Sequence, residues 1–253
     1  MNKTALITGA TSGIGRAVAK KLAQNGYNII ITGRRSNLLE ALKNEISKEI
    51  PGIEVLTLNF DVRKQKEVSE AINGLPEKWS KIDVLVNNAG LAAGLDPIQE
   101  GSIDDWEQMI DTNVKGLLYI TRCVTPSMVK NKSGHIINLG SIAGKEVYEN
   151  GNVYCATKHA VDALTKGMRI DLLPYNIKVT SIDPGMVETE FSMVRFKGDK
   201  KRSDKVYEGL TPLGADDIAD AILFVVTRPP HVNINDMIIM PTAQANSVKT
   251  FRK

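Results

Sequence analysis

The sequence predicts an α/β fold: a single-domain, doubly wound (Rossmann) sheet of seven mostly parallel strands with helices on both faces. Three observations predict it. Short β-branched runs alternate with longer helix-patterned segments along all 253 residues. Most of these runs are apolar at every position, as parallel strands buried on both faces are. No linker rich in Pro, Gly or Ser divides the chain, so we expect one domain over 1–253.

Seven segments have the pattern of strands. They are T-A-L-I-T from Thr4, N-I-I-I-T from Asn28, E-V-L-T-L from Glu54, D-V-L-V-N from Asp83, H-I-I-N-L from His135, K-V-T-S-I from Lys178 and M-I-I-M from Met237. The segments 14–25, 36–50, 64–75, 106–130, 153–172 and 216–227 have helical patterns. This order predicts right-handed βαβ crossovers.

One long segment, 189–213, interrupts the alternation with F-K-G-D-K-K-R-S-D-K and is expected to be irregular. A connection of this length in a compact domain is a lid, a binding loop or a disordered segment. Its Lys and Arg side chains are explained equally well as a solvated surface. Of these alternatives, we expect a substrate lid over 189–213.

Composition restricts the partners. The formal net charge of +3 is too small to predict binding to nucleic acid or to an anionic membrane. Cys123 and Cys155 are the only cysteines, and no Cys or His cluster has metal-ligand spacing, so we expect no metal. No apolar run is long enough for a membrane span or a signal-peptide core. These features predict a soluble, cytoplasmic protein.

The first strand leads directly into T-G-A-T-S-G-I-G and then into a helix. Glycines permit a tight turn and close backbone approach, while the helix N-terminus offers free N–H groups to a pyrophosphate. The spacing is G-x-x-x-G-x-G, and a βα turn with a purely structural role is the alternative. The residues expected to contact a dinucleotide here are Gly9, Thr11, Ser12, Gly13, Ile14 and Gly15.

The second strand ends in T-G-R-R, where NAD-binding folds place an acidic residue for the ribose 2′-hydroxyl. Paired guanidinium groups would instead bind a 2′-phosphate. Arg34 and Arg35 therefore predict NADP(H) as cofactor, although two surface arginines opening a helix would look the same.

The third and fourth strand ends fit the same crevice. Asp61 and Val62 are expected to contact an adenine, and N-N-A-G ends the fourth strand with small residues that leave room for a cofactor. We expect contacts from Asn88, Ala89 and Gly90. Each motif alone has an equally good structural explanation.

The residues that could carry chemistry follow the fifth strand. Ser141 lies at its carboxyl end, and Tyr154 and Lys158 are one helical turn apart on one face. A phenol has a pKa near 10, so forming its anion at neutral pH costs about 4 kcal/mol unless a cation stabilises it. Ser141 could donate a hydrogen bond to a substrate oxygen. No histidine has a partner for nucleophilic catalysis, and we expect packed or surface roles for His135, His159 and His231.

Five motifs together resemble the short-chain dehydrogenase/reductase family over essentially the whole chain: T-G-A-T-S-G-I-G, N-N-A-G, T-N-V-K-G with Asn113, Ser141, and Y-C-A-T-K. The resemblance implies a catalytic tetrad of Asn113, Ser141, Tyr154 and Lys158. It makes the tyrosine the general acid/base and has the serine orient the carbonyl. The lysine lowers the tyrosine pKa and binds the nicotinamide ribose, and the asparagine holds a water of a proton relay.

The resemblance also implies that I-D-P-G-M-V-E-T, after the sixth strand, receives the nicotinamide. The implied contacts are Pro184, Gly185, Val187 and Thr189, together with Tyr154 and Lys158. The T-G-R-R motif resembles the NADP-preferring members of the family, in agreement with the charge argument.

A narrower resemblance, to the 3-hydroxy acid dehydrogenases, rests on D-T-N-V-K-G-L, G-N-V-Y-C-A-T-K-H-A-V, F-S-M-V-R-F-K-G-D, H-V-N-I-N and M-P-T-A-Q. It implies a homotetramer that acts on L-serine, L-allo-threonine or 3-hydroxypropionate and malonic semialdehyde. A small carboxylate substrate needs a cation, and Arg195 is the candidate, with Lys145 and Lys197 behind it.

Two alternative functions stay open. Within the same chemistry, the chain could be a 3-oxoacyl carrier-protein reductase or a generic carbonyl reductase, in which a Gly-rich strand end usually replaces M-P-T-A-Q. A non-catalytic NADP-binding sensor is the alternative from another class. The intact Asn, Ser, Tyr and Lys set argues against a sensor, because a sensor needs no poised phenol.

Overall fold

Seven parallel strands form one sheet in the order β3-β2-β1-β4-β5-β6-β7. The structure is a computed structural model that describes residues 2–253. The strands are β1 (Thr4–Ile7), β2 (Asn28–Gly33), β3 (Val55–Asn59), β4 (Val84–Asn87), β5 (Gly134–Leu139), β6 (Ile177–Pro184) and β7 (Asp236–Ile239). All seven predicted strands are confirmed, with ends shifted by a few residues.

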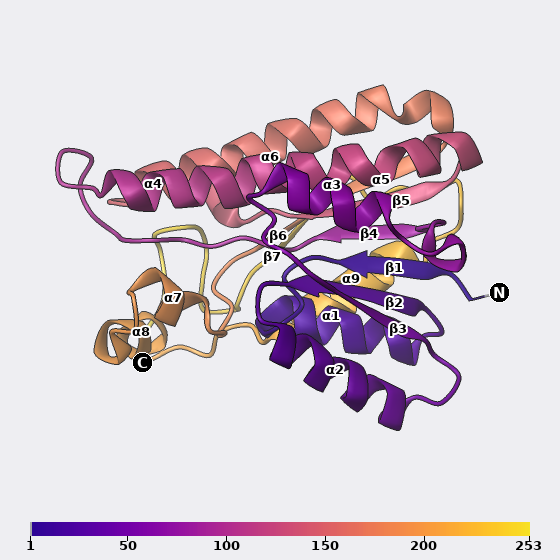
Figure 1. The fold of residues 1–253 in the computed structure, drawn as a ribbon. Coiled ribbons are helices and arrows are strands. Elements are labelled where there is room, and N and C mark those ends of the chain that lie inside the picture. The colour runs from indigo at the N-terminus through magenta and orange to yellow at the C-terminus, as the bar shows by residue number, and fades with distance from the viewer. Residues whose placement is uncertain (1) are drawn as a thin grey trace.

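Helices cover both faces of the sheet (Figure 1). They are α1 (Gly13–Gln24), α2 (Ser36–Glu49), α3 (Gln65–Asn73), η1 (Glu77–Trp79), α4 (Ile103–Ile110), η2 (Asp111–Gly116), α5 (Leu117–Asn131), η3 (Ile142–Gly144), α6 (Asn152–Asp171), η4 (Leu173–Tyr175), α7 (Phe191–Arg195), α8 (Lys200–Tyr207) and α9 (Ala215–Val226). In Figure 1, α1, α2 and α9 lie on one side of the sheet and α3, α5 and α6 on the other. Within residues 2–253, no helix has the length and apolar character that crossing a membrane requires.

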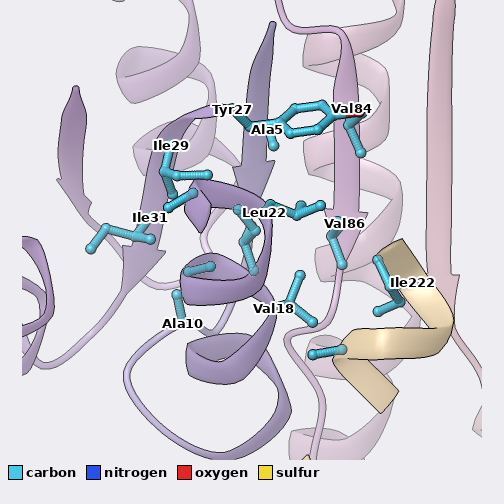
Figure 2. Packing of buried hydrophobic residues seen from close by; sticks show 14 of the residues in the cluster. Ala5, Ala10, Val18, Leu22, Tyr27, Ile29, Ile31, Val84, Val86 and Ile222 are labelled. Atoms are coloured by element: carbon cyan, nitrogen blue, oxygen red, sulfur yellow. The ribbon is translucent and has the colours of Figure 1, made fainter. Parts of the chain in front are cut away.

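The strands are apolar at successive positions because both faces of the sheet are buried. Ile29 and Ile31 on β2 belong to the core formed with Val18 of α1 and Ile222 of α9 (Figure 2), whereas Ile30 between them belongs to the core on the opposite face. Side chains alternate between faces along a strand, so a run without polar residues supplies both cores.

The predicted continuous helix over 106–130 is wrong in two respects. The helix begins earlier, at Ile103, where the Ser102 hydroxyl accepts a hydrogen bond from the Asp105 N–H. The six residues Asp111–Gly116 between α4 and α5 form a π-helix. A π-turn accommodates one extra residue without interrupting the apolar pattern, and it is frequent at functional sites. Asn113 lies in this turn.

The prediction that 189–213 is irregular is wrong over α7 and α8. The Asp199 carboxylate caps α8 by accepting a hydrogen bond from the Arg202 N–H at 3.1 Å. Lys200 and Asp204, one turn apart, form an ion pair at 2.8 Å. Local capping and pairing therefore make a short helix from a segment too polar to show an apolar period. The two helices lie beside the C-terminus at one end of the molecule (Figure 1).

His135 on β5 is a packed residue, as the sequence predicts. Its Nε2 lies 2.9 Å from the Thr180 hydroxyl, and the ring is buried. Burial lowers the pKa of the imidazole to about 3, and the Lys178 cation adds to this effect. The native state therefore holds His135 neutral, whereas the unfolded chain takes up a proton below its ordinary pKa of 6.5.

We expect His135 to contribute to acid sensitivity. Stability from this residue is fully present above pH 6.5 and is lost as pH falls toward the native pKa of about 3. The loss is about 1.4 kcal/mol per pH unit, or about 2 kcal/mol between pH 7 and pH 5. In a His135→Gln variant, the free energy of unfolding in urea should fall less over this interval by about that amount. Equal slopes for the two proteins would contradict the assignment.

Candidate active site

A cleft of about 370 Å³ lies at the carboxyl ends of the strands. Every residue predicted to contact the cofactor lines it except Gly15. Ser141 lines it as well, whereas Asn113 and Arg195 do not. Open α/β sheets bind ligands at this edge, where the strand order reverses between β1 and β4.

The glycine-rich turn has the conformation that its residues permit. Gly9 and Gly13 have φ values of +66° and +50°, which glycine adopts at no steric cost. Gly15 packs closely against the turn and must be glycine, because a Cβ atom there would collide with the Gly9 carbonyl and the Asn88 amide. Ser12 precedes α1 and makes no side-chain cap, so the first N–H groups of the helix are available to an anion. The turn fits a pyrophosphate.

Arg35 extends across the glycine-rich turn. Its Nη2 donates to the Thr11 hydroxyl at 2.8 Å and to the Ser12 hydroxyl at 2.9 Å, and Nη1 lies 3.4 Å from a Glu190 carboxylate oxygen. Arg34 also lines the cleft. Two guanidinium groups thus border the end of the cleft that β2 and the glycine-rich turn form.

Asp61, expected to bind an adenine, is held by a neighbour that the sequence analysis missed. Arg63 donates from Nε to both carboxylate oxygens at 3.0 Å and from Nη2 to one at 2.6 Å. Although burial acts in the opposite direction, the pKa of Asp61 stays below its usual range because of this pairing. Asp61 is therefore an ionised, immobilised wall of the cleft.

Ser141 precedes η3 and lies over the end of β6. Its hydroxyl oxygen accepts a hydrogen bond from the Ala143 N–H at 3.1 Å, and the hydroxyl lies 3.5 Å from the Pro184 carbonyl. The Ser141 N–H donates to Asp183 at 3.2 Å. The backbone of this residue is thereby held while the hydroxyl borders the cleft.

Tyr154 and Lys158 both face the cleft from α6 and are buried. The Lys158 Nζ donates to the Leu139 carbonyl at 2.8 Å and lies 5.9 Å from the centre of the Tyr154 ring. Burial raises the pKa of Tyr154, while Ser141 and Arg195 act in the opposite direction. Burial lowers the pKa of Lys158 to about 8, which Asp183 partly counteracts. The protein alone thus favours a neutral phenol beside a lysine that titrates near physiological pH.

Asn113 lies behind the cleft in the π-turn. Its amide oxygen accepts from the Leu91 N–H at 2.8 Å, and its nitrogen donates to the Leu91 carbonyl at 2.8 Å and to the Thr157 hydroxyl at 3.0 Å. Thr157, to which the sequence assigns no role, in turn donates to the Tyr154 carbonyl at 2.8 Å. Asn113 therefore joins the loop after β4 to the helix that carries the phenol.

Arg195, on α7, lies behind Tyr154. Its guanidinium carbon is 5.6 Å from the centre of the Tyr154 ring and 5.4 Å from that of Tyr148. Nε donates to the Gly94 carbonyl at 3.2 Å, whereas the buried Nη2 has no hydrogen-bond partner within residues 2–253. Arg195 and Tyr154 share a small cavity of about 10 Å³ that adjoins the cleft. Nη2 is a buried donor that a substrate anion could satisfy.

Lys145 and Lys197, the second-choice candidates for binding the substrate carboxylate, are occupied by other contacts in the structure. Lys145 is surrounded by the carboxylates of Asp162, Asp183 and Asp236 and does not line the cleft. Lys197 is paired with Asp105 at 2.9 Å. Both charges are already compensated, so neither is available to a substrate carboxylate.

Several residues that the sequence analysis missed also border the cleft. Phe191 packs edge-on against Tyr154 with ring centres 5.7 Å apart. The other missed residues are Gly33, Phe60, Leu91, Thr112, Leu139, Gly140, Glu190 and Val194. The sequence signal that could have identified them is their position next to the predicted motifs. Among residues 2–253, no three His, Cys, Asp or Glu side chains are grouped as metal ligands.

Known proteins match both the sequence and the fold. The short chain dehydrogenase family matches residues 3–200. The NADP-dependent 3-hydroxy acid dehydrogenase of Salmonella typhi is 50% identical over 241 residues, which is 95% of each chain. Sulfoacetaldehyde reductase 2 of Chromohalobacter salexigens is 45% identical over 97% of this chain and 96% of its own.

Among solved structures, the closed form of serine dehydrogenase complexed with NADP+ is similar with a TM-score of 0.93 and 44% identity over 99% of each chain. Serine dehydrogenase from Escherichia coli is similar with a TM-score of 0.83 and 41% identity, over 96% of this chain and 99% of its own. With the family match covering most of the chain and relatives of this identity spanning nearly all of it, the protein belongs to the short-chain dehydrogenase family.

Proposed function

We propose that this protein is an NADP-dependent dehydrogenase that transfers a hydride between NADP(H) and a short 3-hydroxy acid or its aldehyde. The substrate class includes L-serine, L-allo-threonine and the 3-hydroxypropionate/malonic semialdehyde pair. The observation that carries the substrate class is Arg195, whose buried Nη2 has no partner in the described chain and whose guanidinium lies 5.6 Å from the Tyr154 ring. A cation beside the acid/base residue suits a substrate with an anion close to its reacting carbon.

The names of the relatives support an anionic substrate. One is a 3-hydroxy acid dehydrogenase, one reduces sulfoacetaldehyde and one acts on serine. A 3-hydroxy acid and the alcohol of sulfoacetaldehyde both carry their anion one carbon away from the hydroxyl-bearing carbon. A single guanidinium at a set distance from Tyr154 would recognise both a carboxylate and a sulfonate.

The cleft fits NADP through residues of three strand ends. The glycine-rich turn with the N-terminus of α1 suits the pyrophosphate, and Arg34 and Arg35 suit a 2′-phosphate. The segment that ends and follows β6, with Pro184, Gly185, Val187 and Thr189, also borders the cleft, and the Pro184 carbonyl lies 3.5 Å from the Ser141 hydroxyl. NADP supplies or accepts the hydride when bound.

The protein residues handle the proton and hold the substrate. In the reducing direction, the Tyr154 hydroxyl gives its proton to the carbonyl oxygen as an alkoxide develops; in oxidation, the phenolate takes the proton back. Lys158 beside the ring stabilises that phenolate, and Ser141 donates to the same substrate oxygen. Asn113 orients the phenol through Thr157, and we propose that it also holds the water of a proton relay.

The two arginines should decide cofactor preference. We expect Arg34→Asp together with Arg35→Ser to weaken NADPH binding by roughly 100-fold or more, because each lost charged hydrogen bond costs about 1.5–3 kcal/mol. NADH binding should change little, because NADH has no 2′-phosphate. Titration of cofactor fluorescence measures both constants. Equal losses for the two cofactors would refute the assignment.

Residues 189–213 are proposed to be the substrate lid. The segment contacts the loop after β4 and the neighbouring α4, since the Arg195 carbonyl accepts from the Gly94 N–H at 3.0 Å and Lys197 pairs with Asp105 on α4. The cavity beside Arg195 holds about one water molecule, so we expect the lid to move outward to admit a carboxylate.

We also propose a cytoplasmic homotetramer, supported by exposed apolar side chains such as Leu118, Ile170 and Leu173. Light scattering would measure the oligomeric state.

Substrate choice is tested by NADP-coupled absorbance. The panel contains L-serine, L-allo-threonine, 3-hydroxypropionate, 3-hydroxyisobutyrate, sulfoacetaldehyde and an acetoacetyl thioester. We expect turnover of the small anions. Robust turnover of the thioester alone would favour the carrier-protein reductase, and NADPH binding without turnover of any compound would favour the sensor.

A further inference from the structure

Asp183 is a buried carboxylate at the end of β6, directly beneath Ser141. One oxygen, Oδ1, accepts hydrogen bonds from the Ser141 N–H at 3.2 Å and from the Ser181 hydroxyl at 2.8 Å. A Cβ atom at Gly140 would collide with this oxygen, so the chain approaches the carboxylate closely only because that residue is glycine. Asp183 thus contacts the backbone of the residue proposed to orient the substrate.

The charge of Asp183 is compensated by Lys145. The second oxygen, Oδ2, accepts no hydrogen bond within residues 2–253 and lies 3.4 Å from the Lys145 Nζ. The same ammonium pairs with Asp162 on α6 and lies 3.3 Å from Asp236 on β7. Lys145 directly follows η3, so one side chain connects the Ser141 turn to β6, α6 and β7.

The cluster is balanced in charge. Lys166 pairs with Asp162 at 2.6 Å from the exposed side, and Arg169 lies 3.6 Å from Asp236. Three cations therefore face three carboxylates. Only Asp183 is almost fully buried, so it is the member for which loss of its counter-charge is most costly.

We infer that Lys145 and Asp183 are positioning residues of the reaction, an ion pair that holds the Ser141 backbone in register with α6, the helix that carries Tyr154 and Lys158. The inference rests on the proposed function, because it assigns these residues a role in the same site. Helix α6 is included through Asp162, which lies one turn beyond Lys158 on the same helix face. Neither residue of the pair lines the cleft; the pair acts through the Ser141 backbone and through the charge of Asp183 near Lys158.

The charge of Asp183 also affects Lys158 in the site. Its carboxylate raises the pKa of Lys158 against the effect of burial. Burial raises the pKa of Asp183 itself, and Lys145 counteracts this. Without Lys145, the carboxylate under the Ser141 turn would have no counter-charge. The turn would then move to lessen the cost of this buried charge, and the movement would displace the serine hydroxyl.

The test compares Lys145→Met with Lys166→Met. Both variants remove one ammonium from Asp162, but only Lys145 contacts Asp183. We expect Lys145→Met to lower kcat about 10- to 100-fold, the effect of a displacement on the order of 1 Å, with KM and NADPH affinity within about twofold. Lys166→Met should keep kcat within about twofold. Asp183→Asn keeps an oxygen for the Ser141 N–H and should lose no more than about threefold.

The double variant Lys145→Met/Asp183→Asn is the decisive comparison. It removes the unpaired charge and should recover most of the kcat lost in Lys145→Met. The inference is overturned if Lys145→Met retains kcat per NADPH-binding site and lowers only the melting temperature, if Lys166→Met loses as much, or if the double variant shows no recovery. If Lys145→Met does not fold, Asp183→Ala against Asp183→Asn decides, since the alanine lacks the acceptor and must lose far more kcat.

Failure of the proposed function would look different. If the wild-type enzyme turns over only the acetoacetyl thioester, the substrate class is wrong, but the same kcat ratios are measured with that thioester. The kcat ratios of the variants, measured with the thioester, then decide whether Lys145 and Asp183 have a positioning role.

Discussion

Replacing Tyr154 by phenylalanine should lower kcat roughly 10²- to 10⁴-fold, the contribution that a positioned general acid or base makes. The substitution removes the proton that reduction needs and the phenolate that oxidation needs. It leaves the ring, so the edge-on packing on Phe191 and the Arg195 contact with the ring can persist. NADPH affinity should therefore change little. Steady-state kinetics and cofactor titration measure the two quantities separately.

Tyr119→Phe is the matched control for this prediction. Tyr119 is a partly buried phenol on α5 that packs against the core on the α3, α5 and α6 face of the sheet, and it borders neither cavity. Its loss should leave kcat within about twofold, as surface and peripheral substitutions usually do. Near-normal turnover by Tyr154→Phe would refute the acid/base assignment.

Replacing Arg195 by methionine should lower kcat/KM for malonic semialdehyde and sulfoacetaldehyde by roughly 10- to 150-fold. A charged hydrogen bond contributes about 1.5–3 kcal/mol, and 1.4 kcal/mol corresponds to tenfold. Propanal has no anion, so its kcat/KM should stay within about threefold. The ratio between anionic and neutral aldehydes therefore isolates recognition of the anion from general damage to the site.

Lys197→Met is the control within the same lid. Lys197 is a cation two residues from Arg195, but its ammonium is paired with Asp105 at 2.9 Å. We expect this variant to reduce both kinds of aldehyde with an unchanged preference. If Arg195→Met keeps its preference for anions and loses only thermal stability, Arg195 has a structural role, bridging α7 to the loop at Gly94.

The seven strands and the class of fold were predictable because hydrophobic periodicity records burial, whereas the order of the strands in the sheet came from the structure. Runs such as Asn28–Gly33 supply apolar side chains to both faces and can only be central parallel strands. The two helical errors have a common cause. The π-turn at Asp111–Gly116 and the capped helix at Lys200–Tyr207 depend on hydrogen bonds rather than on an apolar period, and a periodicity argument does not detect them.

Those residues of the candidate site were predictable whose role follows from the residue type and its local position in the chain. Glycine at positions 9 and 13 serves positive φ angles, and a phenol and an ammonium four residues apart share a helix face. Residues whose role depends on a distant partner were missed. Thr157 matters because Asn113, which is 44 positions earlier in the chain, donates a hydrogen bond to its hydroxyl.

By itself, the sequence determined the α/β fold, the position of the glycine-rich turn and the residue types that converge at the strand ends, because these follow from local geometry and from burial of a repeating pattern. Only the tertiary structure decided which of three cations is available to a substrate. Lys145 and Lys197 are compensated by carboxylates from other elements, whereas Arg195 keeps a buried donor without a partner in the described chain. Charge compensation is a property of neighbours in space, and spacing along the chain does not record it.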